Sequence, residues 1–246
     1  MVNVDRVITK LWRIKDHPVV VESIEYLNDY YLRIRFHAPD LVADLDVFPT
    51  AWFRLWAPRQ EDTSQDTMRA YTFSAVDRAA GTFDADFVLH ATGAATDWAK
   101  HAQPGQESLV ALTPAQPKVP AGTSAYVLVG DLTALPAINT WIADTPADQA
   151  ITVAIEDDHA DRTGLPIATH PRLDLHWIEP AANEPKGTEL AAWLRTLPTP
   201  QPDTYVWGAG ERALVRAVKQ HAKETWGMPR GTYFTQYYWI EGKAGH

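Results

Sequence analysis

The chain of 246 residues, 46% of them hydrophobic, is long enough for two domains that each bury their own core. Its 31 acidic residues outnumber 22 basic ones, and the formal net charge of −9 argues against a general binder of nucleic acid or of anionic membranes. Cysteine is absent, which excludes disulfides, thiolate nucleophiles, cysteine zinc sites and iron–sulfur clusters, so a redox role requires an organic cofactor.

The N-terminal segment has neither a long apolar run nor a small-residue cleavage pattern. Nowhere do about 18 apolar residues run together, the length that a membrane-spanning helix needs. We therefore expect a cytoplasmic protein with no membrane insertion.

Short runs of β-branched and aromatic residues fill the first half of the chain, and turn-forming residues at 28–30 and 77–83 separate some of them. One short helix is expected over 95–102, with Thr96 or Asp97 as its cap and Pro104 and Gly105 after its end. The pattern predicts a six-stranded antiparallel barrel, with strands at 19–27, 30–37, 51–56, 69–74, 83–90 and 108–112.

A proline-rich linker at 114–123 marks a change in pattern, so we expect domains at 1–116 and 117–246. Strands and helices alternate in the second half, which predicts a parallel, doubly wound α/β domain. Its predicted strands are 125–130, 150–157, 173–180 and 204–210, with helical segments at 131–144, 188–197 and 211–227.

The segment RAYTFS (69–74) places a cation and an aromatic ring on one face of a strand, because side chains alternate and Arg69, Tyr71 and Phe73 point the same way. An ordinary amphipathic strand, with a surface arginine beside a half-buried tyrosine, is the alternative.

Two glycine-containing loops, 130–133 and 208–211, each follow a predicted strand of the second half. In a doubly wound sheet this is where glycine permits close backbone approach and Thr133 can donate to a phosphate. Simple turns are the alternative, and neither loop matches the generic G-x-G-x-x-G fingerprint.

Six motifs taken in order resemble the signatures of the siderophore-interacting protein family, flavin-dependent ferric-siderophore reductases of the ferredoxin-reductase-like superfamily. They are RAYTFS (69–74), DFVLHATGAATDWA (86–99), PGQ (104–106), VGDLTALPAI (129–138), WGAGE (207–211) and YYWIEGK (237–243). Each is weak alone, but together they span most of the chain.

The resemblance implies an FAD-binding barrel in 1–116 and an NADH- or NADPH-binding domain in 117–246. Arg69 would neutralise the flavin pyrophosphate, Tyr71 would lie against the isoalloxazine ring, and Thr72 would bond near its reactive edge. The other FAD-binding residues that it implies are His90, Gly93, Ala94, Ala95, Thr96 and Trp98. For His90, a histidine satisfied by backbone at a strand end is the alternative.

On the nicotinamide side, the resemblance implies Gly130, Asp131, Thr133, Ala134, Gly208, Ala209, Gly210 and Glu211. Trp239 would cover the flavin or shape the substrate cleft, with a core tryptophan as the alternative. Ser74, Ala94, Leu132 and Ile240 stand where the family usually has arginine, proline, glutamate and a basic residue. These departures leave open a specialised member with altered cofactor affinity or substrate.

The function that follows is an FAD-dependent ferric-siderophore reductase, because flavin links a two-electron donor to one-electron ferric iron. Hard oxygen ligands hold Fe(III) more tightly than Fe(II), so reduction frees the metal. No acid–base residue and no resident metal are expected. Arg54, Arg35 or Arg33, and Lys243 are the predicted contacts to an anionic ferric siderophore.

Two other functions stay open: a siderophore-binding protein without turnover, and a flavin reductase or an oxidoreductase with another electron acceptor. Arg212 and Arg216 mildly favour NADPH over NADH. Residues 156–161 cluster carboxylates with His159, and we expect a solvated loop there. The protein is expected to be a monomer.

Overall fold

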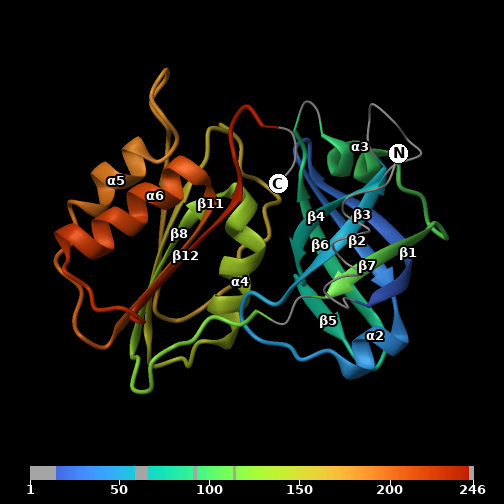
Figure 1. The fold of residues 1–246 in the computed structure, drawn as a ribbon, viewed down its shortest axis with the longest axis horizontal. Coiled ribbons are helices and arrows are strands. Elements are labelled where there is room, and N and C mark those ends of the chain that lie inside the picture. The colour runs from blue at the N-terminus through green and yellow to red at the C-terminus, as the bar shows by residue number, and fades with distance from the viewer. Residues whose placement is uncertain (1–14, 59–65, 91–92, 113–114, 244–246) are drawn as a thin grey trace. The chain divides into compact units, whose positions relative to one another are not determined.

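The computed structural model describes residues 15–58, 66–90, 93–112 and 115–243. The chain divides into two compact units, each with its own sheet (Figure 1). The first comprises the described residues up to Gln116 together with Thr163–Pro166, and the second comprises Pro117–Arg162 and the described residues from Ile167 to Lys243.

The first unit is an antiparallel sheet in the order β4-β3-β7-β1-β2-β6-β5. The strands β4 and β5 lie at opposite ends of this order, yet only Phe73 and Ser74 separate them in the chain. The sheet must therefore curl until its edges meet, which makes it a barrel. Its strands are β1 (Asp16–Asn28), β2 (Tyr31–His37), β3 (Trp52–Pro58), β4 (Asp66–Thr72), β5 (Ala75–Asp77), β6 (Thr82–Val88) and β7 (Glu107–Leu112).

The barrel core follows the alternation of each strand. Leu32, Ile34 and Phe36 of β2 are 0% exposed, and Phe83 and Phe87 of β6 are 1% exposed. Burying one such side chain contributes about 1.5–3 kcal/mol, so period-two patterning fixes which face of each strand turns inward.

The described residues form seven strands in this sheet rather than the six predicted, because β5 has only three residues and no hydrophobic pattern of its own. A short helix α2 (Pro39–Asp44) was also not predicted. The expected helix is α3 (Ala94–His101), but the prediction of its cap was wrong: Gly93 is the N-cap, with φ 152°, and Thr96 is buried within the first turn.

The second unit is a parallel sheet in the order β10-β9-β8-β11-β12, as its alternating pattern predicts. The strands β8, β9 and β10 follow one another toward one edge of the sheet, and β11 and β12 continue toward the other edge. The topological switch point therefore lies between β8 and β11. Its elements are β8 (Ala125–Asp131), η1 (Leu132–Ala134), α4 (Leu135–Asp144), β9 (Ala150–Glu156), β10 (Leu173–Ile178), α5 (Thr188–Leu194), β11 (Thr204–Glu211), α6 (Arg212–Gln220), the π-helical turn η2 (His221–Thr225) and β12 (Tyr233–Trp239).

Two features of this unit differ from the sequence-based expectation. The edge strand β12 was not predicted as a strand, because its exposed and half-buried residues alternate irregularly. The long C-terminal helix becomes π-helical at His221, before Gly227. Among the residues that the structure describes, no helix combines the length and the apolar character that crossing a membrane takes.

Candidate functional site

Arg69 and Tyr71 lie on the same face of strand β4, as the alternation of side chains along a strand predicts. Tyr71 lies opposite Phe53 and Arg69 lies opposite Leu55, and both partners are 0% exposed. The Tyr71 ring packs 4.2 Å from the Phe87 ring, and burial raises the pKa of its hydroxyl. The Tyr71 side chain is thus held by packing, and Arg69 Nη1 donates to the Met68 carbonyl at 2.8 Å. The cofactor roles of both residues stay predictions.

The start of α3 offers backbone donors. The cap residue, Gly93, supplies no side-chain acceptor, so among the described residues no side chain caps the first turn at Ala94, Ala95 and Thr96. A helix N-terminus of this kind attracts an anion, because its N–H groups and the helix dipole both favour negative charge.

In the barrel core, the Phe87 ring contacts side chains of both β4 and α3. Phe87 packs against Tyr71 on one side and against Trp98 of α3 on the other, with its ring 6.2 Å from that of Trp98. Trp98 also stacks on Phe36 and is 9% exposed. The structure therefore makes Trp98 a core residue, and its predicted contact with flavin stays untested.

These groups suit a flavin dinucleotide. A guanidinium and free N–H groups match a diphosphate, and an aromatic face matches a flat apolar ring. Ser74, which follows β4, adds a buried hydroxyl without a hydrogen-bond partner among the described residues. The first unit thus has the residues to hold FAD.

The other predicted residues of this unit lie at strand ends or faces. His90 is exposed after β6, and its carbonyl accepts a bond of 3.1 Å from Lys100 Nζ. The Arg54 guanidinium lies 4.5 Å from the centre of the Trp52 ring. Burial lowers the pKa of Arg54, which nevertheless remains a cation because arginine is so basic.

Two of the predicted substrate cations are paired with aspartates. Arg35 bonds Asp84 through two contacts of 2.7 and 3.0 Å, and Arg33 bonds Asp86 through contacts of 2.7 and 2.9 Å. Their charge is therefore compensated within the barrel wall. Lys243 is exposed beyond β12.

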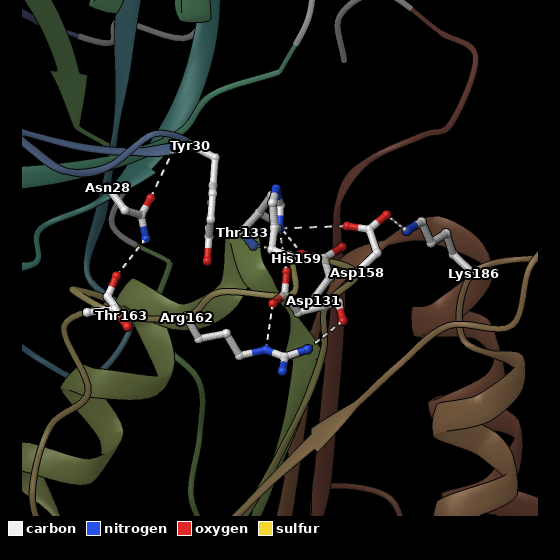
Figure 2. A network of polar contacts seen from close by, with 10 residues as sticks. Asn28, Tyr30, Asp131, Thr133, Asp158, His159, Arg162, Thr163 and Lys186 are labelled. Carbon is white, nitrogen blue, oxygen red and sulfur yellow. Dashed lines mark hydrogen bonds and ion pairs between the residues drawn. The ribbon is translucent and has the colours of Figure 1, made fainter.

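In the second unit, the buried Asp131 joins three strand ends at the switch point. Its Oδ2 accepts from the Glu211 amide at 2.7 Å and from Trp239 Nε1 at 2.8 Å, while its Oδ1 accepts from the amide and the hydroxyl of Thr133. Burial raises the pKa of Asp131, and these donors act in the opposite direction. Figure 2 shows Asp131 and Thr133 together.

The glycines of the two predicted loops are required by the chain's own packing. A Cβ on Gly130 would lie 2.5 Å from the Ala209 carbonyl oxygen, and one on Gly210 would lie 2.6 Å from Asp131 Oδ2. A Cβ on Gly208 would lie 3.1 Å from a methyl of Val218. Close packing against a backbone oxygen explains Gly130, contact with the Asp131 carboxylate explains Gly210, and Gly208 leaves only a tight fit for a Cβ beside side-chain methyls.

Two more buried carboxylates lie at the same edge of the sheet. Glu211, 3% exposed, accepts from the Ala213 amide and so caps α6. Glu156, which was not predicted as a site residue, is 2% exposed and accepts the Gly187 amide with both oxygens, at 3.0 and 2.9 Å. Burial raises the pKa of Glu156.

The expectation of a solvated loop at 156–161 was wrong for Glu156, the last residue of β9, and for Asp157, which are 2% and 3% exposed. Arg162 Nε donates to Asp157 at 2.8 Å, and His159 Nδ1 lies 2.6 Å from the other oxygen of Asp157. The ligand atoms of Asp157, Asp158 and His159 lie within 4.8 Å of one another. Because Arg162 already compensates the buried charge, this cluster stabilises the loop after β9.

A barrel followed by a doubly wound parallel unit defines the ferredoxin-reductase-like class. The reductase GcoB of Amycolatopsis, for example, shares this fold with a TM-score of 0.69 at 15% identity, and 94% of this chain and 71% of that one align. The chain belongs to the siderophore-interacting protein family: the family model described as siderophore-interacting FAD-binding domain matches residues 2–118, and the one described as siderophore-interacting protein matches 123–242. The predicted family is thereby confirmed.

Individual relatives agree with this assignment. The mycobactin import ATP-binding/permease protein IrtA of Mycolicibacterium thermoresistibile is 32% identical over 241 residues, which are 94% of this chain and 25% of that protein. The chain thus spans about a quarter of the length of that relative. The ferric vibriobactin reductase ViuB of Vibrio cholerae is 29% identical over 182 residues, covering 71% of this chain and 65% of ViuB. The crystal structure of SipS from Aeromonas hydrophila has a TM-score of 0.79 at 26% identity, covering 94% and 93% of the two chains.

Proposed function

We propose that the chain is an FAD-dependent ferric-siderophore reductase with NADH or NADPH as electron donor. The net reaction is NAD(P)H + 2 Fe(III) → NAD(P)⁺ + H⁺ + 2 Fe(II), with the ferric ions entering as siderophore complexes. The observation that carries the proposal is the pairing of Arg69 and Tyr71 on β4 with the uncapped start of α3. The similarity to a ferric vibriobactin reductase supports it.

In this proposal residues 1–116 hold FAD and residues 117–246 hold the nicotinamide donor. FAD, when bound, supplies the exchange between a two-electron donor and a one-electron acceptor. Arg69 and the amides at the start of α3 hold the diphosphate, and Tyr71, fixed by Phe87, orients the ring system. No protein group needs to move a proton to the iron complex.

The ferric siderophore is the substrate, and the cation assigned to it is Arg54. Its guanidinium is held over the Trp52 ring and so keeps a fixed place on β3. Once the metal is reduced, oxygen ligands hold it less tightly and the Fe(II) leaves. The cytoplasmic location and the monomeric state remain predictions.

The test begins with an absorbance spectrum of the purified chain after addition of FAD. Anaerobic NADPH should bleach the flavin bands, and a ferric siderophore with an Fe(II) trap should restore them as Fe(II) appears. A protein that takes up no FAD would contradict the proposal and favour a binding role. Rapid reduction of free flavin with slow iron reduction would favour a flavin reductase.

Two variants separate the cofactor from the substrate. Arg69→Ala should weaken FAD binding about tenfold or more, because a charged hydrogen bond to the diphosphate is lost. Arg54→Ala should leave FAD affinity unchanged and raise the KM for an anionic ferric siderophore. Equal FAD affinities in wild type and Arg69→Ala would contradict the role given to β4.

A further inference from the structure

In the described part of the parallel unit, a buried carboxylate accepts a backbone amide at the start of two helical runs and just before a third. Asp131 accepts from the Thr133 amide at the start of η1 and α4, and Glu211 accepts from the Ala213 amide at the start of α6. Glu156 accepts from Gly187, the residue before α5. In dinucleotide-binding folds these amides are the donors to phosphate. Here a carboxylate of the chain already takes one amide at each of the three places.

The space that a phosphate would need is also filled. The Asp131 carboxylate lies against Gly210, where even a Cβ would come within 2.6 Å of Oδ2. At Gly130, the Ala209 carbonyl oxygen and the Ala134 Cβ lie within 2.5 and 2.6 Å of a Cβ position. A ligand therefore cannot approach either glycine from the side on which a Cβ would lie.

The charges at this edge oppose a phosphate as well. Asp131 and Glu156 are register partners on β8 and β9, and the Asp131 carboxylate bonds the Glu211 amide, so three acidic residues gather at neighbouring strand ends. The positive charge of Lys186 acts on Glu156, and Lys186 also contacts Asp158 at 3.5 Å. Arg162 is already bonded to Asp157, and Arg212 follows Glu211 at the start of α6. A diphosphate would add two negative charges next to buried carboxylates.

At this edge of the sheet, the Trp239 side chain is suited to bind the nicotinamide half of the electron donor. The Trp239 indole is half-buried at the end of β12, and its N–H bond of 2.8 Å to Asp131 fixes the ring plane. A fixed indole is a stacking surface for a flat ring such as nicotinamide.

We propose that the parallel unit holds its electron donor by the nicotinamide half, with no phosphate at a helix N-terminus, so that a reduced nicotinamide nucleoside without phosphate donates about as well as the dinucleotide. The inference rests on the proposed function and names the donor class of that site. The reaction balances as dihydronicotinamide riboside + 2 Fe(III) → nicotinamide riboside⁺ + H⁺ + 2 Fe(II), with FAD as the carrier and the ferric siderophore as the oxidant.

The test compares flavin reduction by NADPH, NADH and dihydronicotinamide riboside in stopped flow on the FAD-loaded chain, at mildly alkaline pH where carboxylates are ionised. We expect kcat/KM values within about tenfold of each other, since the phosphates add little binding. A preference for both dinucleotides of about a hundredfold or more would overturn the proposal.

A gain-of-affinity variant sharpens the test. Glu211→Gln removes one buried charge and keeps an oxygen for the Ala213 amide, although the Glu241 amide loses its carboxylate acceptor, so the ratio of NADPH affinity to riboside affinity should rise several-fold. Glu224→Gln is the matched control, because it makes the same change at an exposed position after α6. Equal NADPH affinities in both variants would count against phosphate exclusion.

A binding measurement separates this proposal from the proposed function. If no nicotinamide donor reduces the flavin, the reductase assignment fails, and calorimetry of the wild-type chain with ADP-ribose still decides the inference. We expect no heat of binding at concentrations up to about a millimolar, the range of negligible affinity. Micromolar binding of ADP-ribose would overturn phosphate exclusion whatever the enzyme does.

Discussion

Two arginine–aspartate pairs side by side across β2 and β6 allow a comparison of the same contact at two depths. Arg33–Asp86 and Arg35–Asp84 have the same Nε–Oδ1 distance of 2.7 Å. Their exposure differs: 26% and 0% for the Arg33 and Asp86 side chains, against 49% and 4% for Arg35 and Asp84. Solvent therefore screens the second pair more strongly.

The magnitude follows from this difference. Two unit charges about 4 Å apart attract by about 4 kcal/mol at an effective dielectric constant near 20, before desolvation and side-chain entropy are subtracted. We expect a coupling free energy of about 2 kcal/mol for Arg33–Asp86, and of about 0.5 kcal/mol for Arg35–Asp84, whose arginine is half exposed. Loss of Arg33 alone should cost more than loss of Asp86 alone, because it leaves the fully buried Asp86 carboxylate without its counter-charge, whereas Arg33 without Asp86 is still partly exposed to water.

The assay is a pair of double-mutant cycles built from Arg33→Gln with Asp86→Asn and from Arg35→Gln with Asp84→Asn, followed by urea unfolding. High salt should lower the coupling of the outer pair more than that of the inner one. Equal coupling energies, or a larger value for Arg35–Asp84, would refute the argument from exposure. The same variants also show whether Arg35 acts on the substrate, because a purely structural role leaves the KM for ferric siderophore unchanged.

Two further expectations concern the second unit. Gly210→Ala should lower the free energy of unfolding by about 3 kcal/mol, because φ is 133° and the new Cβ would meet the Asp131 carboxylate. Gly227→Ala, where φ is 63° and no atom lies near the Cβ position, should lower it by only about 1 kcal/mol. Similar losses of stability for the two variants in thermal melts would contradict this expectation. Burial lowers the pKa of His221 from 6.5, so the unfolded chain takes up a proton at this residue before the folded one does. Stability from this residue is therefore complete above pH 6.5 and falls as pH drops below it, and urea unfolding of His221→Gln should show a smaller loss on acidification than wild type.

Local patterning was enough to predict both sheets. In the barrel, period-two burial of residues such as Ile34 and Phe36 marks the inner face, and in the parallel sheet continuous apolar runs mark strands covered on both sides. The three-residue β5 and the edge strand β12 were missed, because neither has enough buried apolar residues to produce a pattern. Their pairing comes from neighbours that are distant in the sequence.

The sequence by itself determined the order of the motifs, and this order indicated the family. It also determined that Arg69 and Tyr71 lie on one face of a strand. Both results depend only on residues that are near one another in the chain. Only the tertiary structure decided which charged groups are already paired or hydrogen-bonded within the chain. The partner of Arg35 lies 49 residues away, that of Asp131 lies 80 residues away at Glu211, and Glu156 reaches Gly187 across 31 residues. Such contacts depend on strand register and burial, which the packing of the whole sheet determines. For this reason the sequence could not show that a residue predicted to bind a ligand instead caps a helix or bonds another part of the chain.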